Sequence, residues 1–554
     1  MTQRPADRGR PTVPGDHLRG YEPDPSRGAA VDQKSPGEQA EPPPRNTWRN
    51  RLIGLAAGLL GAAIVYLVMP ADVATSARVT AATAVLMGLW WMTEAIPIPA
   101  TALVPLVVFP LFNETTAEDG STSPVTVDQV GASYGNNIIF LFMGGFLLAL
   151  AMQRWNLHRR IALLTVRAMG TSPAMVVAGF MAATGFVSMW VSNTATAVMM
   201  LPIGVSVLLL VTNLKQEVPA GATDAEGNVD IESKEVKEQV IESTFGTALM
   251  LGIAYAASIG SLATIIGTPP NTLLVGYLSD NHDINIGFGQ WMLVGLPLAL
   301  VFLVICWFLI TKVLYKPEIK EIPGGRELMN EELAKLGPMS SGEKRVLALF
   351  VLAAVSWVSI PLIFEEPFIS DAGIAVTVGV LLFLCPSGSA RGVRLLDWDS
   401  AVKLPWGVLI LFGGGLALSA QFSSSGLTDW IGEVAAGLGG VPILLVVVVL
   451  VALVIFLTEL TSNTATAATF LPVVGGIALG IDMPVLLATI PVAIAATCAF
   501  MLPVATPPNA IAYGSGYVTI PQMMKAGIWL NLIGIVLITI TAMTLAVWVF
   551  GIVY

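Results

Sequence analysis

A short run of hydroxyl and amide side chains occurs twice in this chain, each time inside a long apolar segment. The copies are Ser192-Asn193-Thr194-Ala195-Thr196-Ala197 and Ser462-Asn463-Thr464-Ala465-Thr466-Ala467, and a Leu-Pro pair follows each. Hydroxyl and amide oxygens accept cations, and amide N–H groups donate to anions. Small polar residues also let membrane helices pack closely, but packing does not require the same order of residues twice. We therefore predict two binding loops.

A second motif also occurs twice, once after each binding loop. Gly267-Thr268-Pro269-Pro270-Asn271 and Ala505-Thr506-Pro507-Pro508-Asn509 each interrupt an apolar segment. Consecutive prolines stop a helix, which leaves free carbonyls before the break and a new helix N-terminus after it. Carbonyls suit a hard cation and helix N-termini suit an anion. Since the motif is repeated, we prefer this interpretation to simple proline kinks.

The composition is that of a polytopic membrane protein. Of 554 residues, 55% are hydrophobic and 12% are charged, whereas about 25% are charged in an ordinary soluble protein. The net charge of -10 argues against a nucleic-acid partner. The three cysteines lie in apolar segments and the three histidines are scattered, so their spacing indicates no disulfide framework, metal site or histidine-based catalytic group.

The apolar segments predict the elements that position these motifs. Residues 1–44, rich in Pro, Gly and charge, read as a disordered tail rather than a signal peptide. The fold is expected to begin near Asn46. Apolar segments follow at 52–70, 79–96, 98–113, 136–153, 174–212, 245–279, 290–315, 345–363, 372–386, 405–420, 441–480, 485–515 and 527–551.

The distribution of Lys and Arg predicts the orientation. If the tail is cytoplasmic, all 28 except Arg78 can lie on the cytoplasmic side, provided that 174–212 and 441–480 each enter and leave on the same side. These two segments are therefore predicted to be re-entrant hairpins with the Ser-Asn-Thr triplets at their bends. The expected fold class is an all-α polytopic membrane protein with eleven transmembrane spans, a cytoplasmic N-terminus and an external C-terminus.

The motifs mark an internal repeat. Aligning the triplets also matches Leu141-Phe142-Met143-Gly144-Gly145 with Leu411-Phe412-Gly413-Gly414-Gly415. Five predicted crossings separate the two copies, and because five is odd the copies have opposite topology. An inverted repeat of this kind is typical of secondary transporters, whose site lies near the middle of the membrane.

In this topology no Lys or Arg reaches the membrane centre. The charge of an anionic solute must then be met by hydroxyl and amide dipoles, helix N-termini and co-bound cations such as Na⁺. Glu94 is expected at a cytoplasmic turn. For Glu459, next to the second triplet, we favour a structural role that hydrogen-bonds its hairpin over ion or proton coupling. Hydrolytic catalysis lacks a Ser/His/Asp set, so we predict no enzyme activity.

With these residues the sequence resembles the divalent anion/sodium symporter family of di- and tricarboxylate transporters. The resemblance covers about 46–554 and is most specific at 188–196, 458–466 and the two Thr-Pro-Pro-Asn breaks. It implies a homodimer with an elevator movement of a transport domain against a scaffold. The expected division is scaffold 45–135, transport repeat 136–289, scaffold 290–404, transport repeat 405–515 and last span 516–554.

The resemblance also implies the site residues. Sodium would be bound at two places, by Ser188, Ser192, Asn193 and the backbone of Gly267, and by Thr458, Thr461, Asn463 and the backbone of Ala505. Substrate carboxylates would contact Ser192, Asn193, Thr194, Thr268, Pro269, Ser462, Asn463, Thr464, Thr506 and Pro507. Na⁺ is the coupling ion, and no other cofactor is expected. The tail and the polar 213–244 insert fall outside the shared pattern.

The sequence predicts a secondary active transporter that carries C4-dicarboxylates such as succinate, fumarate and malate into the cell by sodium-coupled symport. One alternative is a sodium-independent dicarboxylate exchanger, which would leave the dianion unneutralised. Another is a citrate transporter, which the rigid prolines Pro269 and Pro507 disfavour by narrowing the site. A carboxylate receptor or channel on the same scaffold would show no concentrative uptake.

Overall fold

The computed structural model describes residues 45–554 apart from 117–121, 171, 212–242, 319–324 and 365–366. Its contacts divide the chain into two units, Met1–Arg49 and Asn50–Tyr554. All elements belong to the second unit except the start of α1. The predicted disordered tail and most of the 213–244 insert lie outside the described residues.

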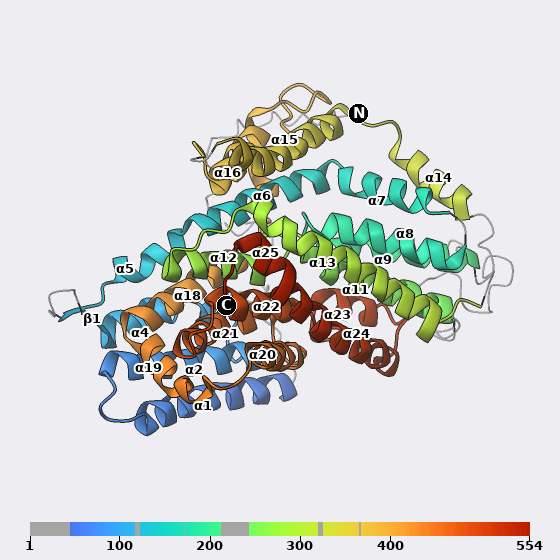
Figure 1. The fold of residues 1–554 in the computed structure, drawn as a ribbon. Helices are drawn as coiled ribbons and strands as arrows, with labels where there is room; N and C mark the ends of the chain where they lie inside the picture. Colours follow the sequence, from blue (N-terminus) through green and yellow to red (C-terminus); the bar gives the residue numbers. More distant parts are fainter. Residues whose placement is uncertain (1–44, 117–121, 171, 212–242, 319–324, 365–366) are drawn as a thin grey trace, which may run out of the picture. The chain divides into compact units, whose positions relative to one another are not determined.

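The regular elements of the described chain are helices, apart from one short antiparallel ribbon (Figure 1). Its first part contains α1 (Arg45–Val68), α2 (Thr75–Thr93), α3 (Ile98–Thr101), α4 (Pro105–Phe112), β1 (Glu114–Thr116), β2 (Thr122–Pro124), α5 (Val127–Ala132), η2 (Ser133–Gly135), α6 (Asn137–Arg154), α7 (Leu157–Ala168), α8 (Pro173–Ser188), α9 (Asn193–Val211), α11 (Thr244–Ser261) and α12 (Pro269–His282). The β1–β2 ribbon is a small departure from the expected all-α fold.

The second part repeats much of this order. It contains α13 (Phe288–Phe308), η3 (Leu309–Leu314), α14 (Gly325–Leu336), α15 (Ser341–Ile363), α16 (Asp371–Leu384), α17 (Trp398–Ala401), α18 (Trp406–Ser424), α19 (Leu427–Ala435), η4 (Ala436–Leu438), α20 (Ile443–Thr458), α21 (Asn463–Gly480), α22 (Val485–Thr497), α23 (Pro507–Gly514), α24 (Ile520–Thr541), η5 (Ala542–Ala546) and α25 (Val547–Phe550).

The helices are those of a multi-pass membrane protein. In the described part of the chain, eight are long and apolar enough to cross a membrane, and six more are apolar but shorter. Four of the shorter helices belong to the predicted hairpins and broken helices, and the other two cover the predicted crossings 98–113 and 372–386. The count of eleven crossings therefore stays a prediction.

Each predicted hairpin is a pair of helices joined by a short turn. α8 and α9 are joined by residues 189–192, and α20 and α21 by 459–462. The polar triplets interrupt the helices there because Ser and Asn side chains compete for backbone hydrogen bonds and favour helix starts. α9 and α21 consequently begin at Asn193 and Asn463.

Each predicted broken helix is also two helices, separated by unwound backbone. The break between α11 and α12 spans 262–268, and the break between α22 and α23 spans 498–506. Thr268 and Thr506 have extended backbone, with φ of -143° and -141°, and a proline pair starts the next helix. Proline is tolerated at the first helical position because its missing N–H would have no partner there.

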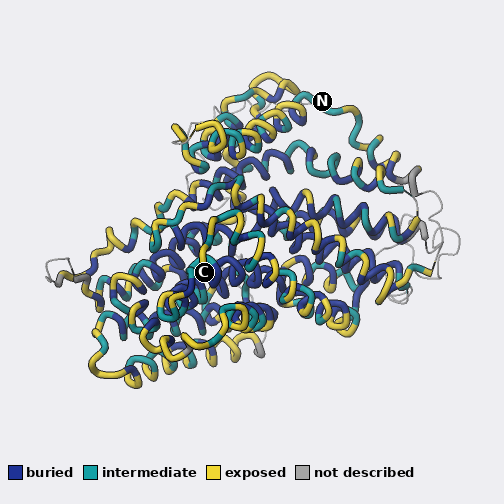
Figure 2. The backbone as a smooth tube through the Cα atoms, viewed as in Figure 1, coloured by how far each residue is buried: buried dark blue, intermediate teal, exposed yellow. Residues whose placement is uncertain are grey.

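The elements around the site form the most buried part of the second unit. Every residue from Phe245 to Ser261 of α11 is buried, and α11 packs against α8, α9, α13 and α23. A helix that is apolar on all sides lies either in a protein core or against lipid, and the burial of α11 places it in the core. Figure 2 shows the contrast with α1, whose outer surface is largely exposed.

Ion pairs connect α7 to the segments that follow α13. Arg159 Nη2 lies 2.7 Å from Glu332 Oε2 on α14, and Arg160 Nε lies 2.7 Å from Glu343 Oε1 on α15. Just before α7, Arg154 at the end of α6 pairs with Asp397, and this pairing lowers the pKa of Asp397 to about 2. The ion pairs of Arg159 and Arg160 fasten α7 to α14 and α15.

The close packing of α8 on α11 depends on two glycines, Gly185 and Gly260. A Cβ atom at Gly260 would overlap the backbone of Gly185. We expect Gly260→Ala to cost about 1–3 kcal/mol, as overpacking usually does, because backbone cannot move aside as a flexible side chain can. The measurement is the melting temperature of the purified protein in detergent.

The matched control is Gly131→Ala in α5, where a Cβ would meet nothing within 4 Å. Alanine is favoured over glycine in a helix by about 1 kcal/mol, so this variant should melt no lower than the native protein. Equal melting temperatures for the two variants would contradict the packing argument.

Candidate functional site

The first turn brings three oxygen atoms together. Ser188 Oγ at the end of α8 lies 2.8 Å from Asn193 Oδ1 and 2.6 Å from the carbonyl oxygen of Ala257 on α11. The Ser188 hydroxyl has one proton and can donate to only one of these acceptors. The amide of Asn193 donates through Nδ2 to Ser261 Oγ at 3.3 Å. A cluster of oxygens with too few protons favours a cation.

The second turn repeats this arrangement with threonine in place of serine. Thr458 Oγ1 at the end of α20 lies 2.9 Å from Asn463 Oδ1 and 2.9 Å from the carbonyl oxygen of Ala496 on α22. Thr461 Oγ1 lies 2.6 Å from Thr466 Oγ1. Ser188 and Thr458 are buried beneath their turns. The two repeats therefore present the same three oxygens.

An asparagine holds each unwound segment in shape. Asn271 Nδ2 donates to the carbonyls of Leu262 and Thr264, at 3.3 and 2.9 Å. Asn509 Nδ2 does the same in the second repeat, donating to the carbonyls of Ala499 and Leu502 at 3.1 Å each. Both asparagines are fully buried. Each amide replaces helical hydrogen bonds that the break removes, which is required where water cannot do so.

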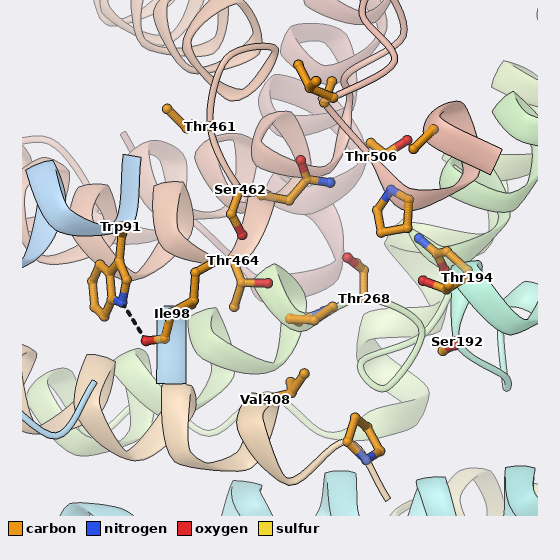
Figure 3. Close-up of a pocket in the computed structure, with 18 of the residues that line it drawn as sticks. Trp91, Ile98, Ser192, Thr194, Thr268, Val408, Thr461, Ser462, Thr464 and Thr506 are labelled. Atoms are coloured by element: carbon orange, nitrogen blue, oxygen red, sulfur yellow. Dashed lines mark hydrogen bonds between the residues drawn. The ribbon is translucent and has the colours of Figure 1, made fainter. Parts of the chain in front are cut away.

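The two repeats meet at Thr268. Its Oγ1 lies 3.1 Å from Thr497 Oγ1 at the end of α22, and both residues are buried. In Figure 3, Thr268 lies between Ser192 and Thr194 of the first repeat and Ser462 and Thr464 of the second. The first break is thus joined directly to the second broken helix.

A cavity of about 840 Å³ lies where the two turns and the two breaks converge (Figure 3). All ten residues predicted to contact the substrate line it. Six of the eight predicted sodium-site residues also line it: Ser192, Asn193, Gly267, Thr461, Asn463 and Ala505. The remaining two, Ser188 and Thr458, lie behind the asparagines. That these residues bind substrate and sodium stays a prediction.

Four helices begin at this cavity. α9, α21, α12 and α23 start at Asn193, Asn463, Pro269 and Pro507, and each of these residues lines it. The N-terminus of a helix carries partial positive charge, so four of them suit an anion. α12 and α23 begin with proline pairs, which have no N–H groups, so these two helices contribute only the positive end of the helix dipole at their first two residues. The helices that end just before the turns and breaks offer carbonyls to cations. The cavity can therefore receive cations and an anion side by side.

The described lining contains no Lys, Arg or His and one charged residue, Glu94. Two histidines form hydrogen bonds outside the lining: His158 Nδ1 is 3.1 Å from the Met152 carbonyl oxygen, and His282 Nε2 is 2.8 Å from the Tyr277 hydroxyl oxygen. Among the described residues no group of three His, Cys, Asp or Glu side chains could hold a metal ion. The chemistry available is binding by neutral oxygens and N–H groups.

Sequence reasoning missed several residues of the site. Asn271 and Asn509 stand in the repeated break motifs, but their role was not assigned. Trp91, Phe142, Phe146 and Val408 line the cavity from α2, α6 and α18, and Trp91 Nε1 is fixed by a hydrogen bond to the carbonyl of Ile98 at 3.1 Å. No motif marks these four apolar residues. Asn271 and Asn509 could have been found from the sequence, because the asparagine is repeated in both break motifs.

Two matching repeats that place polar turns and helix breaks around one cavity, within an apolar helical protein, define a membrane transport protein. The chain belongs to the family described as the sodium:sulfate symporter transmembrane region, which it matches over residues 46–552. The predicted resemblance to the divalent anion/sodium symporters is thereby confirmed.

The relatives are transporters rather than enzymes. The chain is 41% identical over 508 residues to the sodium-dependent dicarboxylate transporter SdcS of Staphylococcus saprophyticus, covering 91% of this chain and 92% of the relative. It is also 41% identical over 494 residues to SdcS of Staphylococcus aureus strain USA300, covering 88% and 90%. The crystal structure of the Alcanivorax borkumensis YdaH transporter has a similar fold, with a TM-score of 0.50 at 13% identity, covering 85% of this chain and 98% of the other.

The hydrogen bonds of Asn271 and Asn509 predict which break unfolds locally when one of these asparagines is replaced. Asn509→Leu removes both carbonyl contacts from the second break and none from the first. We expect faster hydrogen exchange in peptides covering 498–506, because a buried hydrogen bond contributes about 1 kcal/mol and its loss leaves carbonyls unpaired.

The matched variant is Asn271→Leu, which should speed exchange in 262–268 instead. Mass spectrometry of digested protein measures both segments in one experiment. If either variant affects the two breaks equally, the asparagines do not act locally and this assignment is wrong.

Proposed function

We propose that this chain is a secondary active transporter that carries C4-dicarboxylates into the cell together with Na⁺. The observation that carries the proposal is the cavity in which both Ser-Asn-Thr turns and both breaks converge without a cationic side chain. A dicarboxylate dianion needs positive charge there, and bound Na⁺ supplies it. The names of the SdcS relatives, sodium-dependent dicarboxylate transporters, support the same substrates.

Two Na⁺ ions balance one dicarboxylate. A third would make each cycle carry net positive charge inward, which the membrane potential favours by about 2.3 kcal/mol per 100 mV.

The preference for four-carbon substrates over citrate rests on Pro269 and Pro507, which begin α12 and α23 beside the cavity. We also propose a homodimer with a cytoplasmic N-terminus, as the family resemblance and the distribution of Lys and Arg indicate.

An elevator movement is supported by equivalent residues that differ in exposure. Trp190 and Leu460 each stand two residues before the triplet Ser, yet Trp190 is 9% exposed and Leu460 is 68% exposed. Ile266 and Val504 each precede the backbone site of a break, and they are 7% and 78% exposed. Two equivalent repeats in one chain therefore have opposite environments. Exchanging those environments would open the site to the other side of the membrane.

The buried tip lies against the predicted scaffold. Trp190 stacks on Phe288 and on Trp357, with ring centroids 6.0 and 6.5 Å apart, and meets Phe350 edge-on at 4.9 Å. These partners belong to α13 and α15. Leu460 at the exposed tip lines the cavity, as does Glu94, which is expected at a cytoplasmic turn. In this conformation the first tip is closed and the second is open.

Sodium coupling is tested by uptake of labelled succinate into proteoliposomes. With an inward Na⁺ gradient we expect concentrative uptake, because the dianion is bound only when cations neutralise it. With choline in place of Na⁺ at unchanged pH, uptake should fall to the level of protein-free liposomes. Robust uptake in choline would favour the sodium-independent exchanger, and equilibration without accumulation in Na⁺ would favour a channel.

The elevator is tested by distances between spin labels on exposed helix positions. Val198 on α9, Leu479 on α21 and Val304 on α13 are all exposed in this structure. If the two hairpins move as one body, the 198–479 distance should stay constant between Na⁺ with succinate and choline. The 198–304 distance should shift by several ångströms, since a carrier must move the site relative to its frame. A changing 198–479 distance with a constant 198–304 distance would indicate local gating instead.

A further inference from the structure

The side chain of Glu459 joins the second hairpin to the second break. Its Oε1 accepts from the backbone N–H of Phe500 at 2.7 Å, from that of Met501 at 2.9 Å and from Asn531 Nδ2 at 2.7 Å. Its Oε2 accepts from Met501 and Leu502, at 3.1 Å each. The residue is 3% exposed. All four donors are N–H groups, the arrangement that a carboxylate anion requires.

The first repeat makes the same connection without a charge. Met189 stands where the second repeat has Glu459, and its carbonyl accepts from Thr264 Oγ1 at 2.6 Å. In the first repeat a side chain of the break therefore bonds to the backbone of the turn. In the second repeat a side chain of the turn bonds to the backbone of the break. This reversal places a buried negative charge in one repeat only.

Glu459 and Asn509 both stabilise the second break, one by binding its backbone N–H groups and the other by binding its backbone carbonyls. Glu459 binds the N–H groups of 500–502, while Asn509 binds the carbonyls of Ala499 and Leu502. The same segment contains Ala505, whose backbone belongs to the predicted second sodium site. The neighbour of Glu459 in sequence, Thr458, contributes a hydroxyl to that same site. Glu459 is thus adjacent in sequence to one predicted sodium ligand, Thr458, and its carboxylate stabilises the segment that contains another, Ala505.

We propose that Glu459 is a positioning residue that makes the second sodium site the tighter of the two, so that it fills first. The inference rests on the proposed sodium coupling. A fixed anion near a cation site in a low-dielectric interior offsets the cost of removing the ion from water. The first site has Met189 in the corresponding place and lacks this advantage. The brace also keeps the Ala505 carbonyl in place before sodium arrives.

The test measures sodium binding without transport. Purified full-length protein is titrated with NaCl in the absence of substrate, and choline chloride keeps the ionic strength constant. The melting temperature is measured at each Na⁺ concentration, because a ligand that binds only the folded state raises it. The native protein should show a tighter and a weaker phase. E459Q should raise the Na⁺ concentration needed for the tighter phase by about tenfold or more, because it removes the charge.

Two variants separate charge from shape. E459D keeps the charge on a shorter side chain and should stay within about threefold of the native protein, as charge-based affinity depends weakly on small displacements. M189L changes the equivalent residue of the first repeat and should leave the tighter phase unchanged. If E459D is as weak as E459Q, or if E459Q matches the native protein, the proposed role of the charge is wrong.

A second pair of variants keeps the proposal testable if E459Q does not fold. T461V removes a predicted ligand of the second site and should abolish the tighter phase, whereas S192A removes a predicted ligand of the first site and should spare it. Loss of the tighter phase in S192A alone would overturn the proposal. If the native protein is stabilised no more by NaCl than by choline chloride, the proposed sodium coupling itself fails, which is a different result.

Discussion

Unwound backbone in a membrane must find all its hydrogen bonds within the protein, and the rest of this structure depends on how two breaks meet that demand. Unpaired peptide groups in hydrocarbon cost several kcal/mol each. At 262–268 and 498–506 the helical bonds are gone, and Asn271, Asn509 and Glu459 replace them. The breaks are therefore stable enough to leave other carbonyls and helix N-termini free for a solute.

The same demand explains why the site is made of neutral groups. A lysine or arginine at this depth is costly unless it is paired. Hydroxyl and amide groups reorganise at lower cost, and bound cations can leave when the anion does. The oxygens at Ser188 and Thr458 have more acceptors than protons around them. Under the proposed sodium coupling, the transported ions supply the rest of the charge balance.

The repeats are equivalent in their site chemistry and different in their surroundings. Both offer a turn, a break and a hydroxyl behind an asparagine. Trp190 packs into an aromatic cluster on α13 and α15, while Leu460 is exposed. The second repeat also contains the buried carboxylate that the first lacks. Such asymmetry is what a transporter with one site and two access routes requires, since both repeats cannot be open at once.

The sequence alone determined the membrane class, the hairpins as helix pairs, the two breaks and the polar residues that they contribute to the cavity, but not the apolar lining residues such as Trp91 and Phe142. It could do so because Ser-Asn-Thr and Thr-Pro-Pro-Asn act on their own local backbone, and because repetition distinguishes function from packing. Tertiary structure decided which segments meet. The contacts of Thr268 with Thr497, Glu459 with Asn531 and Trp190 with Trp357 join a turn or a break to a helix elsewhere in the chain. Packing selects those partners, and neighbouring residues in the chain do not encode them.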